Sequence, residues 1–314
     1  MTSSTTAAGT ETSAEATGTT TDATATATTG AGTDTDATTS GGETTAGTST
    51  TATTDATTGT SDTDGAAGCS GGQPGLWCPA PGLSWQWQID GQPIDTSVDV
   101  AMYDIDLFDV TDAELSVLKA DGRAIVCYFS AGSHEEWRPD AAAFPAAAIG
   151  DPLDGWPGER WLDVRDATVR EVQAARIELA AARGCDGVEP DNVDGYSNAS
   201  GFPLTADDQL DYNRFLAAQA HAHGLSIGLK NDLDQIPALE EDFDWALNEE
   251  CASYDECALL SPFIAAGKAV FNVEYVDDMA EGPALAAAVC DDALALELST
   301  LIKEWDLGPW RLPC

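Results

Sequence analysis

The chain has 314 residues, of which 54 are acidic and 13 are basic, so its formal net charge at pH 7 is −41. A charge of this sign argues against binding to nucleic acid or to an anionic membrane surface, and it is compatible with a cationic ligand. No apolar run reaches the length of about eighteen residues that a transmembrane helix needs, so we expect no transmembrane segment.

The composition divides the chain near residue 68. Residues 1–68 are nearly all Thr, Ala, Gly, Ser, Asp and Glu, and they include no aromatic residue, Lys or Arg. Such a segment cannot bury enough apolar surface to offset its ordering entropy, so we expect a disordered stalk. Residues 69–314 hold all the Trp, Cys, Lys and Arg residues, and this length is typical of a single (β/α)8 domain.

The eight cysteines all lie in the second part of the chain. Cys251 and Cys257 flank a loop that a disulfide could close, while Cys290 and Cys314 bracket the last segment. Cys69 and Cys78 bracket the start of the folded part, and Cys127 has the surroundings of a buried thiol. This cysteine content indicates an oxidising, extracytoplasmic setting, so we expect an exported protein that is extracellular or attached to the cell surface.

Short apolar or alternating segments, typical of β-strands, recur along the folded part. In chain order they cover residues 85–89, 98–105, 123–129, 161–165, the stretch within 184–196, 226–229, 243–247 and 269–273. Helical patterns lie between them; Thr111 and Glu114 have the spacing of a capping box, and Gly184 is a suitable C-cap. Eight strands alternating with helices predict a parallel sheet closed into a TIM barrel, followed by a helix and an irregular tail.

Polar residues follow the ends of these strands, and the opposite ends carry no comparable set. They are Asp104, Ser130, Asp163, Glu189, Asp191, Lys230, Glu249 and Glu274. Because barrel enzymes have their active sites at the carboxyl ends of the strands, this asymmetry predicts an active-site face.

Glu189 and Asp191 are separated by one residue, so along a strand both side chains leave the same face. A solvated acidic loop is the alternative interpretation of this stretch. Two carboxylates across a cleft, without the spacing of metal ligands, are the smallest set of catalytic groups that can cleave a glycosidic bond. Aromatic residues near the same rim could stack on sugar rings, although each could instead pack in the core. They are Trp85, Trp87, Tyr128, Trp137 and Tyr275.

Several segments within residues 84–276 resemble the motifs of glycoside hydrolase family 114, in the expected order. They are the segments that begin at Trp85, Tyr103, Cys127, Gly187, Gly228 and Asn248, and the Glu-Pro-Asp-Asn element at 189–192 is the most specific. That family consists of endo-α-1,4-polygalactosaminidases on a TIM barrel. The resemblance implies a catalytic pair of Asp191 and Glu249 and a substrate with free amino groups.

Lys230 ends the predicted strand between those of Asp191 and Glu249, and we expect it to lie beside Asp191 and farther from Glu249. We therefore expect a retaining endoglycosidase in which Asp191 is the nucleophile and Glu249 is the general acid and base. Glu189 and Lys230 would hold and tune Asp191, and three acids would face the sugar amines. These are Asp104, Asp106 and Glu274. The remaining expected substrate contacts are Trp85, Tyr103, Tyr128, Ser130, Asn192, Asn231 and Tyr275.

We expect no metal or organic cofactor, and a monomer that acts on a cationic or partly acetylated galactosamine polysaccharide. Two alternatives stay open at this point. One is a stalked barrel that binds carbohydrate without cleaving it. The other is substrate-assisted cleavage of an N-acetylated polymer that uses Glu189.

Overall fold

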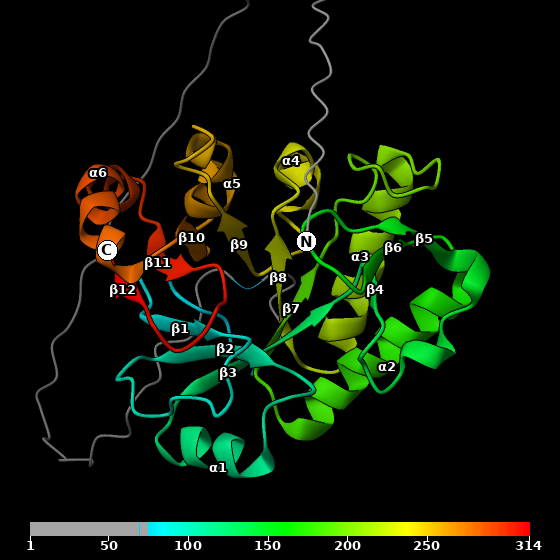
Figure 1. Ribbon diagram of the computed structural model, residues 1–314, viewed down its shortest axis with the longest axis horizontal. Coiled ribbons are helices and arrows are strands. Elements are labelled where there is room, and N and C mark those ends of the chain that lie inside the picture. The colour runs from blue at the N-terminus through cyan, green and yellow to red at the C-terminus, as the bar shows by residue number, and fades with distance from the viewer. Residues whose placement is uncertain (1–68, 70–74) are drawn as a thin grey trace, which may run out of the picture. The chain divides into compact units, whose positions relative to one another are not determined.

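The computed structural model describes Cys69 and residues 75–314 (Figure 1), so the stalk predicted for residues 1–68 lies outside the described residues. Within the described part, nine strands form the main sheet, and the first eight in its order run parallel to their neighbours. In that order they are β1 (Trp85–Gln88), β2 (Met102–Asp106), β3 (Ala124–Ser130), β7 (Gly187–Asp191), β8 (Ser226–Lys230), β9 (Trp245–Glu249), β10 (Val270–Val276), β11 (Ser299–Glu304) and the antiparallel β12 (Leu312–Pro313).

The two ends of this sheet meet because the sheet curls. The indole Nε1 of Trp85 on β1 donates to the carbonyl oxygen of Ser299 on β11 at 2.9 Å. Just beyond the other end of β1, the amide of Asp90 donates to the carbonyl of Leu307 at 3.4 Å. Eight parallel strands brought together in this way confirm the predicted TIM barrel.

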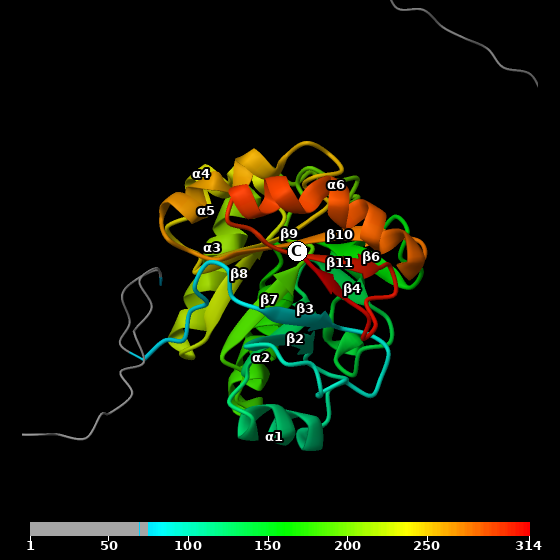
Figure 2. The ribbon, with the colours of Figure 1, turned by 90° about the vertical axis from the view of Figure 1, so that its left-hand side faces the viewer.

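Helices follow most of the barrel strands and lie outside the sheet (Figures 1 and 2). They are α1 (Asp112–Ala120), α2 (Ala167–Arg183), α3 (Ala206–Ala222), α4 (Ile236–Leu239), α5 (Ser261–Ala265) and α6 (Gly282–Ala295). Short 3-10 turns are η2 (Ala141–Ala143), η3 (Ala146–Ala148), η4 (Leu233–Gln235), η5 (Cys257–Leu260) and η6 (Met279–Glu281). The capping box of Thr111 and Glu114 and the left-handed C-cap at Gly184 (φ 76°) are present as predicted.

Two barrel strands differ from the prediction. The segment predicted as the fourth barrel strand, 161–165, overlaps β6 (Glu159–Leu162), which pairs antiparallel with β4 (Ser133–Glu135) and β5 (Ile149–Pro152) in a separate sheet. This small sheet is an insertion between β3 and α2, visible in Figure 1. The eighth barrel strand is instead β11, from the tail that was predicted to be irregular.

The alternation of side chains along the strands separates two apolar cores. Residues such as Tyr103, Cys127 and Val188 point outward and pack beneath the helices. Residues of the opposite face fill the barrel interior, among them Trp85, Trp87, Trp245 and Phe271. A Cβ on Gly228 would lie 2.2 Å from the Trp245 ring, so the absence of a side chain there makes room for the indole.

Four disulfides join the eight cysteines: Cys69–Cys78, Cys127–Cys185, Cys251–Cys257 and Cys290–Cys314. Cys127 is therefore not a buried thiol; it ties β3 to the residues just before β7. None of the helices in the described part of the chain has the length and apolarity needed to span a bilayer.

Candidate active site

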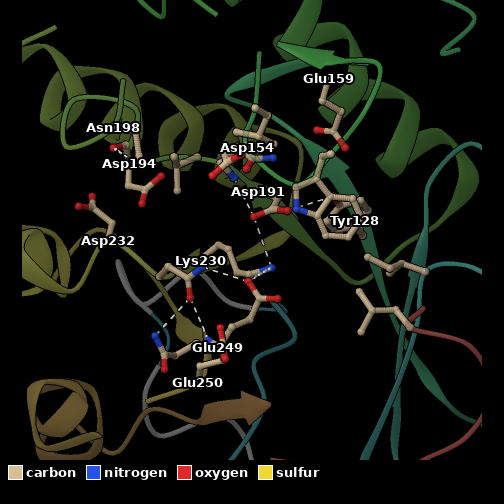
Figure 3. A pocket seen from close by; sticks show the side chains of 18 of the residues that line it. Tyr128, Asp154, Glu159, Asp191, Asp194, Asn198, Lys230, Asp232, Glu249 and Glu250 are labelled. Atoms are coloured by element: carbon tan, nitrogen blue, oxygen red, sulfur yellow. Dashed lines mark hydrogen bonds and ion pairs between the residues drawn. The ribbon is translucent and has the colours of Figure 1, made fainter. Parts of the chain in front are cut away.

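A cleft of about 1060 Å³ lies at the carboxyl ends of the barrel strands (Figure 3). The rim aromatics Trp87 and Trp137 line it, and so do eight of the expected catalytic and substrate-contact residues. They are Asp106, Tyr128, Asp191, Asn192, Lys230, Asn231, Glu249 and Tyr275. Asp191 and Glu249 thus share one mouth of the barrel, as expected for residues that end β7 and β9.

Lys230 lies at the centre of the polar residues beneath this cleft. Its side chain is 2% exposed, and its Nζ lies 2.8 Å from Oε1 of Glu189. Oδ1 of Asp191 and Oε2 of Glu249 are each 3.4 Å from the same nitrogen. Burial lowers the pKa of Lys230, but the three carboxylates outweigh it and raise that pKa well above its usual range. The lysine therefore stays charged and holds the three acids together.

Asp191 is fixed from several sides. The hydroxyl of Tyr128 donates to its Oδ2 at 3.0 Å, and the amide of Asn192 donates to its Oδ1 at 2.7 Å. The amides of Ala131 and Gly132 donate to its carbonyl oxygen at 2.9 and 3.0 Å. A Cβ on residue 132 would lie 1.6 Å from the Asn192 carbonyl oxygen, so this close approach requires glycine.

Glu249 is fixed by a different set of donors. The Tyr275 hydroxyl donates to its Oε1, and Asn231 Nδ2 donates to its Oε2 at 3.1 Å. Asn231 also accepts from the Glu249 amide at 2.9 Å, so one asparagine orients both the backbone and the side chain. The Tyr275 ring stacks on Trp305 with centroids 4.1 Å apart. The carboxylate is thereby held at the edge of the cleft.

The expectation that Glu249 lies farther than Asp191 from the Lys230 charge is wrong. Both carboxylates are 3.4 Å from Nζ. The distance from Lys230 therefore does not distinguish their roles. They differ in exposure instead, because the Asp191 side chain is 18% exposed and that of Glu249 is 26% exposed.

Glu189 and Asp104 are both fully buried and do not line the cleft. Burial raises the pKa of Glu189 to about 7 despite its bonds to Lys230 and to the Trp87 indole. Burial also raises the pKa of Asp104 well above its usual range, and the charge of Glu189 adds to this. Asp104 is therefore the protonated member of the pair and can donate to Glu189. Because Glu189 is buried in this way, it cannot assist the acetamido group of a substrate, as the second alternative required.

Besides Asp104, four predicted substrate contacts lie elsewhere in the fold. Trp85 is in the barrel interior, and the Tyr103 hydroxyl donates to the Val98 carbonyl on the outer face of the sheet. Ser130 is buried against Ser133, their Oγ atoms 2.7 Å apart. Glu274 accepts from the amides of Ala252 and Ser253 and so holds the loop that Cys251 begins. Asp104 and Glu274 therefore do not face a sugar amine.

Asp106 does line the cleft, but a cation already neutralises it. Arg138 donates to both of its carboxylate oxygens, at 2.9 and 2.5 Å, and also to Glu135 at 2.7 Å. Arg138 and the cleft residue Glu159 come from the inserted segment after β3. Sequence reasoning missed them because it assigned part of that segment to the barrel.

Left-handed residues follow the three strands that carry Asp191, Lys230 and Glu249. They are Asn192 (φ 61°), Asn231 (φ 50°), Asp232 (φ 46°) and Glu250 (φ 62°). Asn and Asp tolerate this conformation better than other residues with side chains, whereas Glu rarely adopts it. Strained backbone of this kind is concentrated at functional sites. The Asn residues directly after strand ends are a sequence signal that could have marked these turns.

The profile of glycoside-hydrolase family GH114 matches residues 67–314. The chain is 44% identical to Ega3 from Aspergillus fumigatus, whose crystal structure is a complex with galactosamine; the TM-score is 0.72, and the match covers 76% of this chain and 97% of that one. It is 14% identical to the glycoside hydrolase domain of PelA from Pseudomonas aeruginosa, with a TM-score of 0.57 over 75% of this chain and 98% of that domain, which shows a common fold.

None of the curated proteins matches the sequence. The profile match spans the barrel and every residue of the cleft described above. The chain therefore belongs to glycoside-hydrolase family GH114, and it is a glycosidase.

Proposed function

We propose that this glycosidase is a retaining endo-hydrolase of an α-1,4-linked, galactosamine-containing polysaccharide. The observation that carries the proposal is the pair of carboxylates joined by Lys230. Because Asp191 Oδ1 and Glu249 Oε2 each lie 3.4 Å from Nζ, they can be no farther apart than twice that distance. Retention requires carboxyl groups about 5–5.5 Å apart, and inversion requires about 6.5–9.5 Å. The ceiling applies to the two oxygens nearest Lys230, and it admits the separation that retention requires.

Asp191 is the nucleophile. Lys230, the Tyr128 hydroxyl and the Asn192 amide hold its carboxylate in place at the cleft. One of its oxygens forms a bond to the anomeric carbon while the glycosidic C–O bond breaks. The product of this step is a covalent glycosyl ester, and the leaving oxygen takes a proton from Glu249.

Glu249 acts in both steps as acid and then as base. After it gives its proton to the leaving sugar, its carboxylate accepts a proton from water. The water oxygen then bonds to the anomeric carbon, and the bond to Asp191 breaks. Asn231 and Tyr275 keep Glu249 in place, and its greater exposure suits a group that exchanges protons with water.

The charge of the cleft supports a cationic substrate. Of the residues that line it, fourteen are acidic and two, Arg138 and Lys230, are basic. A polymer with free amino groups would be attracted by this field, and its N-acetylated form would not. The galactosamine bound to Ega3 supports the same sugar class for this chain. The four disulfides support an extracellular location.

The proposal is tested with α-1,4-linked galactosamine oligosaccharides, fully deacetylated or fully N-acetylated. We expect cleavage of the deacetylated series, and NMR should show that the first product retains the anomeric configuration of the substrate. Asp191→Asn and Glu249→Gln should each lower kcat by at least about a thousandfold, as the loss of an essential acid–base or nucleophilic group does. Glu297→Gln, which removes an exposed carboxylate at another left-handed residue, is the control.

Chemical rescue separates the two roles. With Glu249→Ala and a substrate that has a good leaving group, azide should restore turnover and give an α-glycosyl azide. An inverted first product in the wild type, or full activity of Asp191→Asn, would overturn the assigned mechanism.

A further inference from the structure

Two further carboxylates line the cleft outside the proposed catalytic pair. Asp194 is in the loop after β7, and Asp232 is in the turn between β8 and η4. Their side chains face each other across one wall of the cleft, as Figure 3 shows. The chemistry proposed above uses neither of them, and the sequence did not single them out as sugar contacts.

Asp232 is held in place with one oxygen unsatisfied. The residue is 5% exposed, and its Oδ2 accepts from Asn213 Nδ2 at 2.9 Å. Its Oδ1 is buried and has no hydrogen bond of acceptable geometry among the described residues, although the Tyr196 side chain is close enough to interact with the carboxyl. A buried carboxylate oxygen without a partner is costly, so a ligand that donates to it would gain binding energy.

Asp194 adds a second acidic group to the same wall. Burial and the repulsion of Asp191 raise the pKa of Asp194 to about 6, and burial and the repulsion of Asp194 raise that of Asp232 to about 8. Lys230 does not balance this pair, because its Nζ is already bonded to Glu189 and lies against Asp191 and Glu249. Near neutral pH Asp232 therefore holds a proton, and a cation bound between the two carboxyl groups would lower both pKa values and release that proton, so the wall favours a positively charged ligand.

We propose that Asp194 and Asp232 form a subsite that binds the ammonium group of a 2-amino-2-deoxy sugar unit next to the scissile bond. The inference rests on the proposed function and adds the residues that select the deacetylated unit. An ammonium group has three donors and can bond both carboxylates at once. A neutral acetamido group would leave the two carboxylates without a cation and would add an acetyl group in the space between them.

A calcium ion fits this wall less well than an ammonium group. Calcium takes six to eight oxygen ligands. Here Asn213 turns its Nδ2, a donor, toward Asp232, and its Oδ1 accepts from Gln209. Two facing carboxylates are therefore enough for an ammonium group and too few for calcium.

The test measures oligosaccharide binding by calorimetry in a Glu249→Gln background, which prevents turnover. The added changes are Asp232→Asn and Asp194→Asn. Asn keeps the shape of each side chain, and at residue 232 it also suits the left-handed backbone. Asp255→Asn is the matched control, because Asp255 is also left-handed (φ 60°) but is exposed and outside the cleft.

We expect each of the two cleft variants to weaken binding of a deacetylated galactosamine tetrasaccharide by about ten- to a hundredfold, the usual effect of losing one charge-assisted hydrogen bond. Binding of the N-acetylated tetrasaccharide and the effect of Asp255→Asn should change less than about twofold. Thermal melting of each variant verifies folding, and Asp194→Asn serves as the test if Asp232→Asn does not fold.

Equal weakening for both tetrasaccharides, no weakening, or no binding of the deacetylated tetrasaccharide by the parent would overturn the subsite. So would calcium binding at micromolar concentration that Asp232→Asn abolishes. Hydrolysis of the polymer distinguishes the two proposals. If Asp232→Asn remains active and its selectivity for the deacetylated polymer is unaltered, the subsite proposal alone is wrong. If the wild type binds the deacetylated polymer selectively but does not hydrolyse it, the proposed function alone is wrong.

Discussion

Replacing Lys230 with Met removes the buried cation that three carboxylates share. At 3.4 Å and an effective dielectric constant of 20, each attraction to Asp191 and Glu249 is about 5 kcal/mol before the desolvation of the ammonium group is subtracted. Because removing one partner of a buried ion pair leaves an uncompensated charge, we expect a net loss of about 3–5 kcal/mol in the free energy of unfolding. Met keeps most of the side-chain volume, so packing against Trp87 should change little.

The size of this loss should depend on pH. In the wild type the pKa of Glu189 is raised to about 7, above the value of 4.5 for an exposed glutamate. The folded state therefore binds more protons than the unfolded state, and stability is lost as pH rises from 4.5 through 7. Without Lys230 this folded-state pKa rises further, so the variant continues to lose stability above pH 7. The deficit should therefore be smaller at pH 5 than at pH 8.

Thermal or denaturant unfolding at a series of pH values measures this deficit. A loss of about 3–5 kcal/mol corresponds to a fall in Tm of about 6–20 °C for a domain of this size. Lys303→Met is a control for which the dependence of stability on pH should have the opposite sign. Burial lowers the pKa of Lys303 to about 7, so the wild type gains stability from this group's titration as pH rises from 7 toward 10, and the variant should not. A deficit of Lys230→Met that is the same at pH 5 and pH 8 would refute the reasoning.

Two further predictions follow from the strand-end turns and the charge of the cleft. Glu250→Gly should raise Tm by about 2–4 °C. The left-handed conformation (φ 62°) costs roughly 1–2 kcal/mol for a residue with a side chain, and glycine removes this cost but adds conformational entropy to the unfolded chain. A lower Tm would show that this conformation is not strained. Added salt should raise KM for a deacetylated polymer and leave KM for an N-acetylated one unchanged, because screening limits the reach of the electric field to about 8 Å at physiological ionic strength. A salt-independent KM on the cationic polymer would contradict electrostatic attraction.

The fold could be predicted where local pattern and tertiary environment agree. The strand predicted at 123–129 is apolar after Arg123 because it is buried on both faces, as parallel sheets require. The prediction failed where the sequence pattern does not indicate which strand a segment pairs with. The alternation around Trp161 fits an antiparallel strand of the insertion as well as a barrel strand. The true eighth strand, β11, was missed because it contains Lys303, which is fully buried and donates to the Gly308 carbonyl at 2.6 Å.

The roles of Glu189 and Asp191 show why the site could be predicted only in part. Their spacing places both on the same face of β7, and the structure agrees. Two residues along a strand span about 6.6 Å, however, so one lies a full layer deeper in the barrel than the other. Asp191 reaches the cleft, whereas Glu189 is enclosed between Lys230 and the Trp87 indole. A strand pattern indicates the face to which a carboxylate belongs, but its depth depends on where the neighbouring strands end. The same reasoning explains Asp104 and Glu274, which are acids near strand ends that the surrounding chain covers, and it makes loop residues such as Asp194 and Asp232 the acids left to meet a substrate.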